Sequence, residues 1–425
     1  MVAYESLQVG RSSLAFCSMP HVDSVSVGLW FRTGSLFEKK GLYGGAHFLE
    51  HMLFKGTRRR NALQISQEIE SRGGDLNAFT AEEMTCYYAR LDADHLDLAL
   101  DVLFDMLWNS NFPKEEIERE RGVILEEIRM YEDQPSSLVT EKLNQAIWPK
   151  YGIGRPIAGS PESVTEMRRA DLMDFWRQHY SPESLVVSVA GGVDEEKVRK
   201  LLAKYLKMSR HGEDEKIPAY RPLTTKQVTL VPIDKPIQQC HLALGVLAYP
   251  KTDPRRYALK LLSVILGENM SSRLFQTVRE KHGLAYSINS TTAHFRETGA
   301  FYVQAGVDSA KLGKALKLVA AELQKTVERR VSDKELRQAK DYLIGQIKLH
   351  LESTTSRMMW MGESLIGLGY MLQPKEMLQD LEKVTTEGVQ AVARELFRPG
   401  RMSLGVVGPG VDEKLLREVS KPFYL

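Results

Sequence analysis

Apolar residues recur along this chain with the two periods that distinguish strands from helices. Residues 25–31 alternate between apolar and small or polar side chains, and residues 185–190 are rich in valine, so both are predicted to be strands. Residues 113–130 begin with a proline and an acidic turn, which predicts a helix, and another helix is predicted to end at Gly73-Gly74. Strands interspersed with helices predict an α+β fold, in which a mixed or antiparallel sheet is packed by helices.

The chain also contains an internal repeat. Asp92–Leu100 matches Asp308–Leu316, about 216 residues later, in charge and in apolar spacing. The ends of the two copies agree as well, because the valine-rich strand that starts near residue 185 recurs at 402–407. Residues 208–222 are polar and contain glycine and prolines, which is the composition of a linker. We therefore predict an N-terminal domain at residues 1–207, a linker at 208–223 and a homologous C-terminal domain at 224–425.

Composition narrows the class of protein. A length of 425 residues is too great for one hydrophobic core and predicts at least two domains. Lysine plus arginine number 57 and aspartate plus glutamate 55, which argues against binding to nucleic acid or to an anionic membrane. Three widely separated cysteines fit a reducing compartment. No signal-like segment or membrane-spanning apolar run is present, so we predict a soluble, cytoplasmic protein.

Residues 47–51 contain two histidines one helical turn apart. Side chains at i and i+4 of a helix lie on one face, so His47 and His51 can bind one divalent metal, and Glu50 points toward the same place. This order of two imidazoles and a carboxylate is typical of a zinc site that activates water. Catalytic zinc usually takes three protein ligands, so another ligand is expected from elsewhere in the chain.

The best candidates for that ligand are Glu120 and Glu127, two turns apart on one face of the predicted helix at 113–130. The apolar neighbours Val123 and Ile124 predict partial burial of this face, and a buried carboxylate needs a partner such as a metal. On the helix alone, a solvated and highly charged surface is the favoured explanation of the glutamates. The histidine pair favours the metal-binding alternative.

Residues 44–57 and 73–80, followed by Glu120 and Glu127, resemble the pitrilysin-type inverzincin metallopeptidases. Within that family, the resemblance is to the branch of the mitochondrial processing peptidase and its bacterial two-domain relatives. It implies two homologous α/β-roll domains and one Zn²⁺ per chain. The metal ligands that it implies are His47, His51 and Glu127, with Glu120 as a supporting residue.

The second copy of the repeat lacks these residues. When Gly74 is aligned with Gly283, the positions of His47, Glu50 and His51 fall opposite side chains that do not form a zinc site, and Glu127 also falls opposite a residue that is no zinc ligand. We therefore expect no metal there, and we infer that the ligands serve chemistry rather than the fold. The remaining histidines, among them His179, lack partners at ligand spacing and are predicted to be surface or core residues. The replacements are Arg256 for His47, Leu259 for Glu50, Lys260 for His51 and Gln346 for Glu127.

Two further segments are candidates for substrate contacts. A short strand is predicted at Asn77, Ala78, Phe79 and Thr80, and an exposed strand edge can bind an extended peptide through main-chain hydrogen bonds. An ordinary hairpin strand is the alternative. The resemblance implies that Arg279 and Tyr286 contact the substrate near the scissile carbonyl, where they can donate to a carbonyl oxygen and stabilise an oxyanion. A surface arginine and a core tyrosine are the alternatives.

These residues predict a zinc-dependent endopeptidase that hydrolyses unfolded peptides or oligopeptides. Glu50 would take a proton from water and pass one to the leaving amine. The resemblance further implies a homodimer enclosing a chamber, with Arg279 and Tyr286 of one subunit facing the zinc of the other. Two rival hypotheses are a non-catalytic partner subunit of a processing-peptidase-like complex and a regulatory metal-binding module.

Overall fold

The computed structural model describes residues 4–207 and 229–423. The predicted linker at 208–223 lies outside the described residues. The chain divides into two compact units, and each is discontinuous in sequence. Unit 1 comprises Met1–Ile128, Arg155–Pro218 and Lys348–Lys375, and unit 2 comprises Arg129–Gly154, Ala219–Ile347 and Glu376–Leu425.

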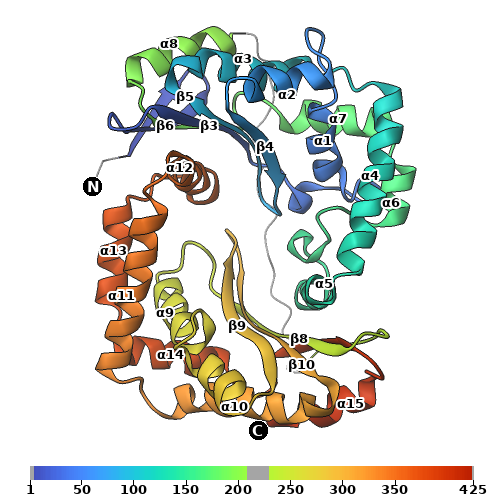
Figure 1. The fold of residues 1–425 in the computed structure, drawn as a ribbon, viewed down its shortest axis with the longest axis vertical. Helices are drawn as coiled ribbons and strands as arrows, with labels where there is room; N and C mark the ends of the chain where they lie inside the picture. Colours follow the sequence, from blue (N-terminus) through green and yellow to red (C-terminus); the bar gives the residue numbers. More distant parts are fainter. Residues whose placement is uncertain (1–3, 208–228, 424–425) are drawn as a thin grey trace. The chain divides into compact units, whose positions relative to one another are not determined.

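Unit 1 is built on a six-stranded sheet with the order β1-β2-β6-β3-β5-β4. Strands β3 to β6 of this sheet are labelled in Figure 1. Only β2 and β6 run parallel, and the other neighbours are antiparallel. The predicted strands at 25–31 and 185–190 are both central in this sheet, which explains why both are buried on their two faces. The strands are β1 Glu5–Val9, β2 Ser12–Ser18, β3 Ser24–Phe31, β4 Asp75–Thr80, β5 Thr85–Asp92 and β6 Leu185–Gly191.

Helices cover both faces of this sheet. Alternate strand residues such as Leu29 pack against one group of helices that includes α1 and α3, whereas Trp30 on the opposite face packs against α12. Figure 1 shows α12 on one side of the sheet and the α1–α3 group on the other. The helices are α1 Gly45–Leu53, α2 Ala62–Glu70, α3 Leu96–Asn109, α4 Lys114–Glu132 (which continues into unit 2), α6 Pro161–Glu166, α7 Arg169–His179, α8 Glu195–Leu206 and α12 Thr354–Leu368.

Unit 2 repeats the same design with five strands in the order β7-β11-β8-β10-β9. This order corresponds to β2-β6-β3-β5-β4 of unit 1, and β7 and β11 form its one parallel pair. The predicted α+β class with two homologous sheets is therefore confirmed. The strands are β7 Leu230–Asp234, β8 Gln239–Ala248, β9 Ala285–His294, β10 Gly299–Asp308 and β11 Ser403–Gly408.

The helices of unit 2 also lie on two faces of its sheet. A large apolar core joins one face to α9, α10 and α14, and α5 packs on the other face against β8 and β11. None of the helices in the described part of the chain is both long and apolar enough to span a bilayer. The helices assigned wholly or mainly to unit 2 are α5 Pro135–Ile147, α9 Arg255–Gly267, α10 Leu312–Glu328, α11 Asp333–His350, α13 Pro374–Lys383, α14 Thr386–Leu396 and α15 Glu413–Val419, with a π-helical segment at Phe275–Lys281.

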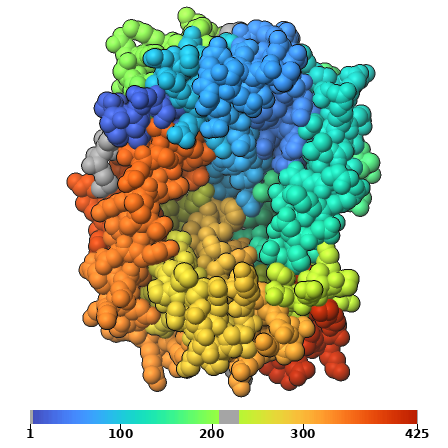
Figure 2. Space-filling view, viewed as in Figure 1, coloured from blue at the N-terminus to red at the C-terminus, as the bar shows by residue number. Residues whose placement is uncertain are grey.

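Each sheet is covered on one face by a helix from the other half of the sequence. The helix α12, near residue 360, packs on β2, β3 and β6 of unit 1, and α5, near residue 140, packs on the sheet of unit 2. Figure 2 shows orange atoms of the late segment next to dark blue atoms from the start of the chain. Within unit 1, Gln373 and Tyr4 exchange two hydrogen bonds. The predicted domain ranges follow the order of the sequence and contain no such exchange.

Glycines allow both exchanged helices to approach their sheets closely. A Cβ atom on Gly362 of α12 would lie 2.0 Å from Cε2 of Trp30, and one on Gly245 of β8 would lie 2.7 Å from Cδ1 of Ile147 in α5. The Trp30 ring is rigid, so its close contact requires glycine at position 362, whereas the end of the Ile147 side chain would have to shift to admit a side chain at position 245.

Candidate metal centre

The helix α1 presents three polar side chains because its opposite face is buried. Its residues Phe48, Leu49 and Met52 are fully buried in the core of unit 1, and His47 and His51 are left on the other side. The side chain of His47 is 12% exposed and that of His51 is 21% exposed. The predicted sharing of one helical face is therefore observed.

A buried carboxylate holds the start of this helix. Glu38 accepts hydrogen bonds from the backbone N–H groups of Gly44 and Ala46, each at 3.0 Å. Gly44, the N-cap residue, has a left-handed backbone conformation and no side chain that could cap the helix. The side chain of Glu38, six residues earlier, caps the helix instead. Burial raises the pKa of Glu38 to about 8, although these N–H groups and nearby Arg155 act to lower it.

The helix α4 brings a third donor to the two histidines. Glu127 Oε2 lies 3.5 Å from His47 Nε2 and 3.7 Å from His51 Nε2. One donor atom from each of the three residues lies within 4.8 Å of the others, a spacing that could hold a metal ion. No other group of three His, Cys, Asp or Glu residues in the described ranges brings its donor atoms this close. Two imidazoles and one carboxylate are also the donor set of many catalytic zinc sites, so the residues fit this metal.

Glu120 contacts the far side of the His51 ring. Its Oε2 lies 3.0 Å from His51 Nδ1, and its Oε1 lies 2.7 Å from Lys55 Nζ. Burial raises the pKa of Glu120, but the hydrogen bonds with His51 and Lys55 outweigh it and bring the pKa below its usual value. An ionised Glu120 fixes Nδ1 of His51 as the protonated nitrogen and leaves Nε2 free to bind a metal.

His47 is neutral because of burial. Burial and the neighbouring His51 lower the pKa of His47 to about 4, so its ring carries no charge at neutral pH. Its Nδ1 atom is buried and has no hydrogen-bond partner within the part of the chain that the structure describes. The ring is held by packing, with its centroid 4.7 Å from that of His51.

Glu50 points from α1 toward the end of strand β4. The Thr80 hydroxyl donates a hydrogen bond of 2.6 Å to Glu50 Oε2. Burial raises the pKa of Glu50, and Glu127 adds to this effect, whereas Thr80 and His51 oppose it. A carboxylate whose pKa is moved up toward neutrality is suited to take and return a proton.

Strand β4, which contains Asn77, Ala78, Phe79 and Thr80, forms one edge of its sheet. Among the described strands it pairs only with β5, so its other edge is unpaired by strands. Ala78 packs on the same side as α1, whereas the Phe79 ring makes an edge contact with Trp30 at 5.7 Å between centroids on the opposite face. The predicted strand and its edge position are thus observed.

Arg279 and Tyr286 belong to unit 2 and lie next to each other there. The guanidinium carbon of Arg279 is 4.7 Å from the centroid of the Phe275 ring and 5.6 Å from that of the Tyr286 ring. Tyr286 is 77% exposed, so the alternative of a core tyrosine is wrong. Both side chains are available at the surface of their unit.

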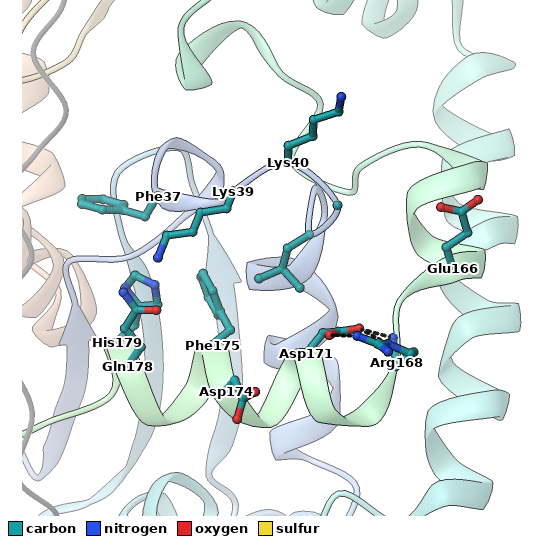
Figure 3. A pocket seen from close by; sticks show the side chains of 12 residues that line it. Phe37, Lys39, Lys40, Glu166, Arg168, Asp171, Asp174, Phe175, Gln178 and His179 are labelled. Atoms are coloured by element: carbon teal, nitrogen blue, oxygen red, sulfur yellow. Dashed lines mark hydrogen bonds and ion pairs between the residues drawn. The ribbon is translucent and has the colours of Figure 1, made fainter.

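A separate surface pocket of about 450 Å³ lies between α7 and residues 37–42. Figure 3 shows Phe37, Lys39 and His179 gathered at one end of it and the ion pair of Arg168 with Asp171 at the other. The lining includes none of the predicted site residues. His179 is 3% exposed, which confirms that it is a core histidine.

Comparison with known proteins gives the family. Residues 14–161 match the family described as Insulinase (Peptidase family M16), and residues 166–343 match the one described as Peptidase M16 inactive domain. A protein from Streptomyces coelicolor named an uncharacterized zinc protease is 40% identical over 94% of this chain and 88% of its own. The chain belongs to peptidase family M16.

Other similar proteins support the same family and fold. A Bacillus subtilis protein, also named an uncharacterized zinc protease, is 35% identical over 89% of this chain and 91% of its own. The crystal structure of a protease from Helicobacter pylori has a TM-score of 0.90 at 22% identity and covers 96% of this chain and all (100%) of that one. A peptidase M16 inactive domain from Pseudomonas fluorescens has a TM-score of 0.87 at 21% identity, over 96% of this chain and 98% of that one. Identities this low concern the fold alone, and they confirm the predicted M16 fold.

The helix of unit 2 that corresponds to α1 is α9, and it has an ion pair in place of the candidate metal-binding residues. Lys260, which falls opposite His51 in the repeat, makes an ion pair with both carboxylate oxygens of Glu268 at 2.7 and 2.8 Å. The family description of the C-terminal match as an inactive domain agrees with this replacement.

Three contacts at the site were not anticipated from the sequence. They are the capping of α1 by Glu38, the ion pair of Lys55 with Glu120, and the hydrogen bond of Thr80 to Glu50. An acidic residue shortly before the Gly44-Gly45 pair is a signal that could have indicated the first, because glycine at a helix start leaves the N–H groups uncapped. Nothing in the spacing of the other two pairs indicates contact.

Proposed function

We propose that this M16 protein is a zinc-dependent endopeptidase that hydrolyses unfolded peptides or oligopeptides. The proposal depends on one observation above all, the convergence of His47 Nε2, His51 Nε2 and the Glu127 carboxylate beside Glu50. These three residues would hold one Zn²⁺ per chain. The names of the relatives as zinc proteases support the same metal and the same class of reaction.

The chain's own residues divide the chemistry between them. Zinc, when bound, supplies a Lewis acid that lowers the pKa of water and polarises a carbonyl group. Glu50 takes the proton from water and later gives a proton to the leaving amine, which its raised pKa favours. Glu120 keeps His51 in the required tautomer through Nδ1, so it acts through a ligand and not on the substrate.

Substrate binding is assigned to strand β4 and to unit 2. The unpaired edge of β4, from Asn77 to Thr80, would add an extended peptide as a further strand through main-chain hydrogen bonds. Arg279 and Tyr286 would contact the peptide near the scissile carbonyl and stabilise the oxyanion. In the proposed homodimer, these two residues reach the zinc centre of the other subunit. The cytoplasmic location also stays a prediction.

The main rival is a non-catalytic partner subunit on the same fold. A non-catalytic subunit does not need a complete set of metal ligands or a catalytic base. In this chain, Glu50 and all three proposed metal ligands are present and grouped in unit 1. A regulatory metal-binding module would need the three donors but not Glu50. Zinc content and peptide cleavage of the wild type, measured beside those of Glu50→Gln, therefore separate the three hypotheses.

The test measures zinc content and cleavage of a mixed library of quenched, unfolded peptides. The wild type is expected to contain one zinc per chain and to cleave peptides, and a chelator should abolish cleavage until zinc is restored. Glu50→Gln should retain zinc and lower kcat by at least about 100-fold. Near-normal cleavage by Glu50→Gln, or a zinc-loaded wild type that cleaves nothing, would overturn the proposal.

A further inference from the structure

We propose that Thr80 is a positioning residue for Glu50, and that its hydroxyl fixes the catalytic base relative to the edge strand that receives the peptide. This inference rests on the proposed function. It concerns a residue that is part of the substrate strand but whose side chain points away from the strand's open edge, toward α1.

The first observation is the hydrogen bond itself. Thr80 Oγ1 lies 2.6 Å from Glu50 Oε2, which is the usual length of a charge-assisted hydrogen bond from a hydroxyl to a carboxylate. Both side chains are partly buried, so water does not readily replace either partner. Loss of the hydroxyl would remove the side-chain donor to Glu50 Oε2 and leave only the backbone N–H of Thr80, which also acts on this carboxylate, so the carboxylate would be held less firmly.

The second observation is the direction of the Thr80 side chain. Successive residues of a strand point to opposite faces, and Leu76 and Ala78 pack on the face that carries α1, whereas Phe79 packs on the opposite face with Trp30. Thr80 continues the series of Leu76 and Ala78, so its hydroxyl faces α1. Its backbone is fixed by the ladder, where Thr80 is opposite Thr85 of β5. The orientation of Thr80 is thus set by the sheet and not by Glu50.

The third observation concerns the other hydroxyl close by. Thr85 Oγ1 lies 3.5 Å from Thr80 Oγ1, but it donates its single proton to the backbone carbonyl of Thr33 at 2.9 Å. Thr85 therefore has no proton to offer toward Glu50, while an ionised Glu50 can only accept. The proton of Thr80 is the one directed at the base.

These contacts connect two parts of the proposed site. A peptide that pairs with β4 takes its register from the backbone of this strand, and the same strand, through Thr80, holds Glu50. The distance between the base and the bound peptide is then set by one residue. A positioning role of this kind affects the chemical step more than the binding of the peptide or the metal.

The test compares Thr80→Val, which removes the hydroxyl and keeps the branched shape, with Thr80→Ser, which keeps the hydroxyl. Thr80→Val should lower kcat by about 10- to 100-fold, with KM and zinc content near the wild-type values, and Thr80→Ser should restore most of kcat. An unchanged kcat in Thr80→Val, or equal losses in both variants, would overturn the inference. Loss of zinc in Thr80→Val would show a general structural role instead and would also overturn it.

Crystal structures of the two zinc-loaded variants give a second measurement that needs no activity. The Glu50 carboxylate should move from its wild-type position in Thr80→Val and keep that position in Thr80→Ser. If it stays in place in Thr80→Val, Thr80 does not position it. A wild type that binds zinc but cleaves no peptide would contradict the proposed function, whereas the crystallographic comparison would still decide the role of Thr80.

Discussion

Glu120 and Glu127 contact opposite nitrogens of the same imidazole, that of His51. Glu120 Oε2 lies 3.0 Å from Nδ1, and Glu127 Oε2 lies 3.7 Å from Nε2. Glu127 follows Glu120 by seven positions on α4, which places the two glutamates two turns apart on one helical face. One helix therefore supplies both a donor to the metal centre and the group that orients another donor.

Removal of the Glu120 carboxylate should weaken metal binding. Glu120→Gln leaves Nδ1 of His51 without an anionic partner and removes the ion pair of Lys55, so we expect zinc affinity to fall by about 10- to 100-fold and cleavage to recover at high zinc. Competition with a zinc-binding dye measures the affinity. The same substitution at Glu115, which is exposed on the same helix, is the control and should change nothing. Unaltered zinc affinity in Glu120→Gln would refute a role for this residue in supporting the site.

Helical spacing accounts for what the sequence could predict about this centre. The i, i+4 relation of His47 and His51 and the two-turn relation of Glu120 and Glu127 are fixed by helix geometry, so spacing alone places each pair on one face of its helix. Contacts between different helices and strands do not follow from the spacing of residues along the chain. The pairing of Glu50 with Thr80 depends on where β4 lies beside α1, and a local pattern does not contain that information.

The exchange of α5 and α12 could not be predicted for a related reason. An amphipathic helix shows which of its faces is apolar but not which sheet covers it. Both copies of the repeat contain a helix at this place in the chain, and packing of each helix on the sheet of its own copy would bury its apolar face equally well. The decisive features, such as the contact of Gly362 with Trp30, are complementary shapes from distant parts of the sequence.

The close approach of α12 to its sheet predicts a specific destabilisation. In Gly362→Ala, the new Cβ would lie 2.0 Å from the rigid Trp30 ring, so helix and sheet must separate and unit 1 should lose about 1–3 kcal/mol of stability. Gly345→Ala, in α11, is the matched control, because nothing lies within 4 Å of its Cβ and the better helix propensity of alanine should stabilise slightly. Thermal unfolding of both variants measures the effect. Equal melting temperatures for the two would contradict this account of the packing.

His179 predicts a loss of stability in acid. Burial, with a smaller effect of Lys39, lowers its pKa to about 4, whereas an unfolded histidine titrates near 6.5. The unfolded chain therefore binds more protons than the native one between these values, so the stabilisation is complete above about pH 6.5 and is lost as pH falls toward 4, at most about 3 kcal/mol. Between pH 7.5 and pH 5, the melting temperature of the metal-free wild type should fall further than that of metal-free His179→Phe. His21→Gln, a change at an exposed histidine, is the control and should show the pH dependence of the wild type. Identical pH dependence of the melting temperature in wild type and His179→Phe would refute the role of His179 in acid destabilisation.

The proposed homodimer predicts complementation between two inactive variants. Glu50→Gln damages the zinc centre, and Arg279→Ala damages the group that unit 2 contributes. If Arg279 acts on the zinc centre of the other subunit, a mixed dimer has one intact site, built from Glu50 of one chain and Arg279 of the other. Random exchange should then restore about a quarter of wild-type activity, because half of the dimers are mixed and each has one of two sites.

The matched control mixes Glu50→Gln with Glu127→Gln. Both changes fall within the zinc centre of unit 1, so every site in the mixed dimer lacks either the base or a donor to the metal, and no recovery is expected. Two different affinity tags allow the mixed dimers to be isolated before peptide cleavage is measured. Recovery with Arg279→Ala but not with Glu127→Gln would assign Arg279 to the partner's site. Isolated mixed dimers of Glu50→Gln and Arg279→Ala that stay inactive would mean that each subunit uses its own Arg279, since only then do both sites contain a defect.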